Sequence, residues 1–103
     1  MTMEDRRLEL QNKLLEICPN VYFQPPASLQ MSYPAIRFKV DDRKNKFGND
    51  VVYGQSHYFE VTVIDFDPTS EVFDKVSMLP TAKFNNAYSA DGLNHQVFTI
   101  NYK

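Results

Sequence analysis

The chain has 103 residues, of which 43% are hydrophobic and 14% aromatic, and it carries a formal net charge of −2 with a pI near 5.6. This balance predicts one folded domain, argues against intrinsic disorder and gives no general attraction to nucleic acid. Cys18 is the only cysteine, so an internal disulfide is excluded, and no apolar run approaches the roughly 20 residues that span a membrane. We therefore expect a soluble protein of a reducing, intracellular compartment.

Residues 4–18 predict an amphipathic helix. Leu10, Leu14, Ile17 and Cys18 recur at helical spacing, and Pro19 stops the helix. The apolar stripe of this helix needs a surface to cover, and a sheet would supply it. Residues 20–24 then predict a short strand, which the two prolines at 25 and 26 end.

Residues 56–66 give the strongest strand signal, because β-branched and aromatic side chains dominate them. Alternation puts one purely apolar set on a single face: Phe59, Val61 and Val63. This pattern predicts a central strand with a core on one side.

Residues 34–42 alternate equally clearly, and we expect them to lie antiparallel to residues 56–66. The set expected to face the core is Ile36, Phe38 and Val40. The set expected to face outward is Ala35, Arg37, Lys39 and Asp41.

The stretch between these two strands predicts a projecting loop or hairpin arm at about residues 43–55. Residues 43–49 are polar and are expected to form a loop with Gly48-Asn49 as its turn, while residues 51–55 could extend the arm. Long connections of this kind are often functional.

The last third of the chain predicts one helix and two strands. Asp67 is expected to cap a helix over residues 70–79, with Pro68 at its first position. Strands are expected over residues 81–90 and 93–102, joined by a tight turn at Asp91-Gly92. The chain 1–103 is therefore expected to form a single α+β domain, with two helices on an antiparallel or mixed sheet of four or five strands, in the order α-β-β-(long loop)-β-α-β-β.

Two acidic groups resemble parts of catalytic or metal sites. Asp65, Asp67, Ser70 and Glu71 could supply oxygen ligands, but the ligand series and bidentate glutamate of a calcium loop are missing, so a helix cap is the better interpretation. Asp41 and Asp42 could serve acid–base chemistry, but without a partner a solvated turn is the better interpretation.

Cys18, His57 and His95 could be arranged as a Cys–His pair, but no nucleophile motif surrounds Cys18 and the three lack zinc-ligand spacing. We expect Cys18 to be a buried structural thiol. No catalytic, cofactor-binding or metal-binding residue is predicted, and the protein is not expected to be an enzyme.

Arg43, Lys44 and Lys46 form a basic group beside Phe47. Such a group could contact a nucleic-acid backbone, be simply solvated, or contact a partner subunit.

Several segments between residues 20 and 102 carry a family pattern: NVYFQPP, then YPAIRF-x-x-DD, VTVID-x-DP-x-S, LP and AD-x-LNH-x-VFT. This pattern resembles the small tail-completion proteins of tailed bacteriophages and prophages, which are found at the head–tail junction and are often described as minor capsid or tail-terminator proteins.

The resemblance implies a structural protein that assembles as a ring, hexameric in the tail terminators, to cap the tail tube and join it to the head. The implied partners are other copies of the chain, the tail-tube protein and head connector proteins, with no membrane, no specific nucleic acid and no cofactor. The implied location is the virion, and the host cytoplasm during assembly. On this basis the candidate subunit contacts are Arg43, Lys44, Lys46, Phe47 and Tyr53. The alternatives are a small adaptor or nucleic-acid-binding module, or a hydrolase that uses His57 or His95.

Overall fold

The computed structural model describes the backbone of residues 3–48 and 51–101, and the side chains of residues 4–41 and 57–101. Its elements are α1 (Met3–Ile17), β1 (Val21–Phe23), β2 (Ala35–Gly48), β3 (Val51–Asp65), α2 (Glu71–Ser77), β4 (Lys83–Ala90) and β5 (Leu93–Asn101). The strands form one sheet in the order β1-β2-β3-β5-β4, in which β1 is parallel to β2 and the other neighbours are antiparallel. The predicted α+β class, with two helices and a mixed sheet, is confirmed.

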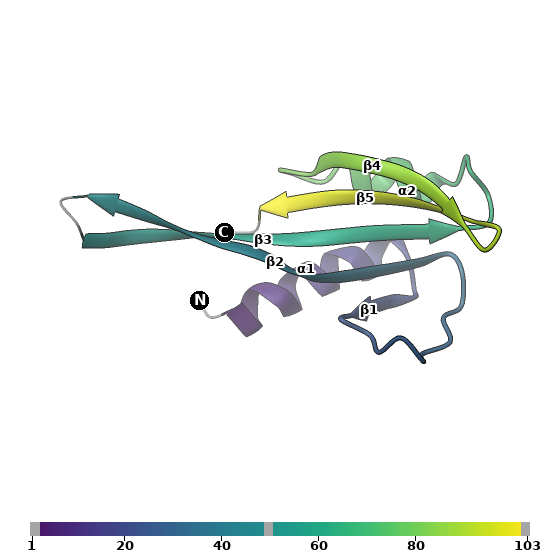
Figure 1. Cartoon of the computed structure of the whole chain (residues 1–103), viewed down its shortest axis with the longest axis horizontal. Coiled ribbons are helices and arrows are strands. Elements are labelled where there is room, and N and C mark those ends of the chain that lie inside the picture. Colours follow the sequence, from purple (N-terminus) through teal and green to yellow (C-terminus); the bar gives the residue numbers. More distant parts are fainter. Residues whose placement is uncertain (1–2, 49–50, 102–103) are drawn as a thin grey trace.

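Both helices lie on the same face of the sheet (Figure 1). Leu10 and Leu14 from α1, and Phe73 and Val76 from α2, all belong to the buried core. The other face carries no helix, and we call it the helix-free face.

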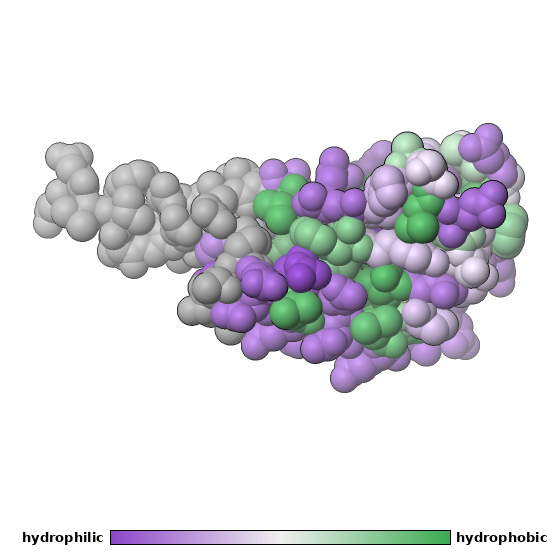
Figure 2. Space-filling model, turned by 90° about the horizontal axis from the view of Figure 1, so that it is seen from below, coloured by the Kyte–Doolittle hydropathy of each residue, from purple (hydrophilic) through white to green (hydrophobic). Residues whose placement is uncertain are grey.

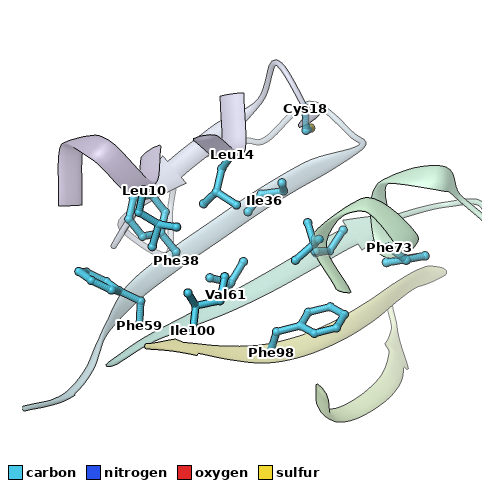
Figure 3. Packing of buried hydrophobic residues seen from close by; sticks show 12 residues of the cluster. Leu10, Leu14, Cys18, Ile36, Phe38, Phe59, Val61, Phe73, Phe98 and Ile100 are labelled. Carbon is cyan, nitrogen blue, oxygen red and sulfur yellow. The ribbon is translucent and has the colours of Figure 1, made fainter. Parts of the chain in front are cut away.

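The core forms between these helices and the central strands (Figure 3). Phe38, Val61 and Phe98 lie side by side on β2, β3 and β5, and none of them is more than 1% exposed. Full burial of one such side chain stabilises a fold by about 1.5 to 3 kcal/mol. The predicted core face of the central strand is confirmed, because Phe59, Val61 and Val63 are all fully buried.

Two predictions for β2 are wrong. Val40 was expected in the core but is 36% exposed, because the strand leaves the helix-covered part of the sheet there and the register skips Asp41. Ala35 was expected to face outward in solvent but is fully buried. Ala35 pairs with Ile64, which lies on the same face of the sheet and is only 2% exposed. Cross-strand neighbours therefore bury this end of β2 on a face that no helix covers.

Of the two alternatives expected at about residues 43–55, the loop is wrong and the hairpin arm is what forms, because residues 43–48 continue β2 and residues 51–55 belong to β3. The two strands pair from Ala35↔Ile64 to Gly48↔Val51. β1 accompanies β2 only along residues 36–38, and β5 accompanies β3 only along residues 58–65. The pair therefore continues beyond the rest of the sheet as a two-stranded ribbon, residues 42–48 and 51–57 (Figure 1).

The start of α2 differs from the prediction. Ser70, not Asp67, is the N-cap: its hydroxyl accepts a hydrogen bond from the backbone N–H of Val72 at 3.3 Å. The helix also stops at Ser77, two residues earlier than expected. β4 begins at Lys83 instead of residue 81, because Thr81 has a φ of +66° that interrupts an extended strand.

Candidate functional site

The predicted subunit-contact residues all fall on the ribbon. Its register places Arg43 opposite His57, Lys44 opposite Ser56, Lys46 opposite Gly54 and Phe47 opposite Val52, while Tyr53 lies in β3 between the last two pairs. The side chains of these five residues lie outside the described part of the chain. The backbone pairing nevertheless gathers the five positions on one projecting element.

Asp41 and Asp42 lie where the ribbon leaves the body. The solvated turn expected for them is wrong, because both belong to β2. The register passes from Val40↔Phe59 to Asp42↔Tyr58 and leaves Asp41 as the extra, exposed residue of a β-bulge. Bulges increase local twist, so this one helps to set the direction in which the ribbon leaves the body.

The two histidines lie far apart along β3. His57 pairs with Arg43, whereas His95 pairs with Ile64, seven residues further along β3, or about 23 Å at strand rise. The His95 ring stacks on Tyr88, with ring centroids 4.6 Å apart, and its Nδ1 lies 3.2 Å from the carbonyl oxygen of Leu93. The structure therefore does not bring the histidines into one site.

Cys18 is buried at the end of α1, as predicted, with an exposed fraction of 1%. Its thiol donates a hydrogen bond to the carbonyl oxygen of Pro34 at 3.3 Å. Burial raises the pKa of the Cys18 thiol, and the negative charge of Asp65 adds to this shift. A protonated, enclosed thiol of this kind is a poor nucleophile.

The oxygen-rich segment before α2 forms a local turn. The Asp67 carboxylate accepts hydrogen bonds from the backbone N–H and the hydroxyl of Thr69, both at 2.9 Å, and these donors lower the pKa of Asp67. Asp65 accepts a hydrogen bond from the backbone N–H of Asp67 at 3.4 Å. Among the side chains that the structure describes, those of residues 4–41 and 57–101, no group of three or more His, Cys, Asp or Glu could hold a metal ion.

Sequence reasoning missed a hollow of about 550 Å³ near the β1 end of the helix-free face. Its polar and charged lining comes from two cross-strand pairs, Arg37↔Thr62 and Lys39↔Glu60. Gln24 and Pro25 line it as well. Lys39 Nζ lies 3.9 Å from Glu60 Oε2. Alternation alone placed Arg37 and Lys39 on an outer face, and only the β2–β3 register reveals their partners.

Exposed hydrophobic side chains are spread over several elements. Phe66 is 65% exposed, Met78 83% and Phe84 54%. From below the view of Figure 1, hydrophobic residues likewise appear as separate groups among hydrophilic ones (Figure 2). Every residue of the outer strand β4 is exposed.

No helix in the described part of the chain is long and apolar enough to cross a membrane. Comparison of the sequence with protein-family models and with curated proteins found no match.

Proposed function

We propose that this chain is a structural subunit of the head–tail junction of a tailed bacteriophage or prophage. In this proposal it acts as a tail-terminator or tail-completion protein: copies form a ring that caps the tail tube and joins it to the head. The sequence segments between residues 20 and 102 that resemble this class are the starting point.

The ribbon is the observation that carries the proposal. The five-stranded sheet and the two helices already enclose the core. β2 and β3 nevertheless continue past the core, and the molecule is accordingly elongated, with extents of 51 × 23 × 23 Å. An isolated two-stranded hairpin is marginally stable in water. A projecting ribbon is therefore well suited to contact a neighbouring subunit, which would cover its backbone edges.

Ring closure requires contacts between two different surfaces of each copy, related by a rotation. The ribbon supplies one surface that is separate from the core. Arg43, Phe47 and Tyr53 are the proposed contact residues, since arginine and aromatic side chains contribute most of the binding energy at many interfaces.

A shortened ribbon tests the proposal. Replacing residues 45–55 by Asn-Gly joins the paired residues Lys44 and Ser56 through a two-residue hairpin turn and leaves the core intact. We expect a folded protein that no longer assembles on tail tubes. The control is Asp50→Gly, which introduces the same Asn-Gly dipeptide in the full-length chain.

Electron microscopy of particles gives the readout. Overlong or unjoined tails in the absence of the protein would support a terminator, whereas normal tails with leaking heads would indicate a head-completion factor. Normal tail length and infectivity with the shortened ribbon would contradict the proposed role of the ribbon.

A further inference from the structure

We propose that the hollow on the helix-free face is a carboxylate-binding site, centred on Arg37, that receives an aspartate or glutamate side chain of a partner protein. The hollow is lined by β2, β3 and the segment that follows β1. It is separate from the ribbon, and the proposal does not depend on ring formation.

Hydrogen-bond donors from two neighbouring strands converge on this hollow. Arg37 is half-buried, and no carboxylate of the described residues pairs with it. Thr62, the cross-strand neighbour of Arg37, also lines the hollow, and its hydroxyl can donate a hydrogen bond. A carboxylate in the hollow would accept from both the guanidinium and this hydroxyl.

Gln24 adds a further donor in a fixed position. Its side-chain oxygen accepts a hydrogen bond from the backbone N–H of Val40 at 3.2 Å. This contact holds the amide across the edge of β2 and leaves the NH₂ group available to a ligand.

The charges of the lining favour a single negative charge. Arg37 and Lys39 are positive and Glu60 is negative, and the Lys39–Glu60 contact at 3.9 Å leaves the Arg37 charge unbalanced. A guanidinium binds a carboxylate through two parallel hydrogen bonds. A phosphate dianion would meet repulsion from Glu60 in the same hollow. Pro25 supplies an apolar wall that suits the methylene groups of an acidic side chain.

The test follows the backbone amide signals of the lining residues Lys39 and Thr62 by NMR while acetate is added at constant pH and ionic strength. We expect a saturable shift that Arg37→Gln weakens at least about tenfold, or about 1.4 kcal/mol. Glu60→Gln should strengthen acetate binding, because it removes a repelling carboxylate. Lys83→Gln, on the exposed strand β4, is the matched control and should leave acetate affinity unchanged.

Arg37→Lys provides a second check in case the Arg37→Gln variant fails to fold, which circular dichroism would reveal. It keeps the charge but loses the planar fork, so acetate should bind more weakly than to the wild type. Equal affinity in the wild type and both Arg37 variants would overturn the proposal, as would equal shifts with chloride or phosphate, which would indicate an adventitious ion only.

Two further measurements identify the source of the carboxylate. A blocked Gly-Glu-Gly peptide should bind, whereas its Gly-Gln-Gly counterpart should not. Sedimentation equilibrium shows whether another copy of the chain is the partner. Self-association that acetate and Arg37→Gln both weaken would assign the carboxylate to a second copy. Self-association that neither acetate nor Arg37→Gln changes would assign the carboxylate to a different protein. Binding of the two peptides with equal affinity would contradict recognition of an acidic side chain.

Discussion

Leu14 and Leu15 are neighbours in α1 with opposite environments. Leu14 is fully buried against the sheet, whereas Leu15 is 43% exposed. We expect Leu14→Ala to lower the free energy of unfolding by about 2 to 5 kcal/mol, because it removes buried methyl groups and leaves a cavity. Leu15→Ala should change it by about 0.5 kcal/mol or less. Urea denaturation of the pair measures the difference, and equal losses would show that α1 does not pack as described.

Cys18 gives a pH-dependent contribution to stability. Burial raises the pKa of its thiol in the folded protein above the value of about 8.5 expected when unfolded. As the pH rises above the unfolded pKa, the unfolded chain releases this proton before the folded protein does, so stability falls. Below that pKa both states keep the proton and the contribution does not vary with pH.

Cys18→Ala tests this linkage. The free energy of unfolding of the wild type should fall more steeply between pH 8 and pH 10 than that of the variant, in parallel denaturation series. The cavity of the variant shifts its whole curve but not its slope. Parallel curves over this range would contradict the raised pKa.

At the scale of the elements, the β4–β5 hairpin depends on its turn. Asp91 has a φ of +54° and Gly92 a φ of +75°, as a two-residue type I′ turn requires. A Cβ atom added at Gly92 would meet nothing within 4 Å, so Gly92→Ala would suffer from backbone strain alone.

We expect Gly92→Ala to lower the free energy of unfolding by about 1 to 2 kcal/mol in urea denaturation. Asp91→Asn is the control and should change it by about 0.5 kcal/mol or less, because asparagine also adopts positive φ readily. Losses of similar size in both variants would show that the turn conformation is not the cause.

Alternation and turn chemistry predicted the body of the fold, but for the ribbon they left a projecting loop and a hairpin arm as alternatives. Residues 56–66 and the Asp91-Gly92 turn have unambiguous patterns, and the structure confirms both. Residues 43–48 are polar except for Phe47 and Gly48 and flank no core, so their composition gives little support to a strand. They are held by cross-strand hydrogen bonds, which any non-proline residue can make.

The helix cap and the Arg37 hollow show two other limits of sequence reasoning. Asp67 and Ser70 are both good caps, and only the hydrogen bonds distinguish the turn residue from the cap. Arg37 and Lys39 were predicted on the outer face, but their relation to Thr62 and Glu60 depends on a register across more than 20 residues of chain. Local pattern contains no information on that register.

For the whole molecule, the number of strand neighbours predicts how stability is distributed. β3 has partners on both sides along residues 58–64, over the buried core, whereas the ribbon has only its own two strands. Opening the body requires loss of the core, but opening the ribbon does not. In dilute solution we expect ribbon amides to exchange with solvent at least about tenfold faster than the hydrogen-bonded amides of residues 58–64.

Hydrogen exchange at several protein concentrations separates the possible outcomes. Slower exchange of the ribbon at higher concentration, with the body unchanged, would show that another copy covers it, as ring assembly requires. Equal protection of ribbon and body in dilute solution would contradict the expectation, because the ribbon would then unfold only together with the core. The variant with residues 45–55 replaced by Asn-Gly is the control: its body amides should keep wild-type protection, because the core between the helices and the sheet does not use the removed residues.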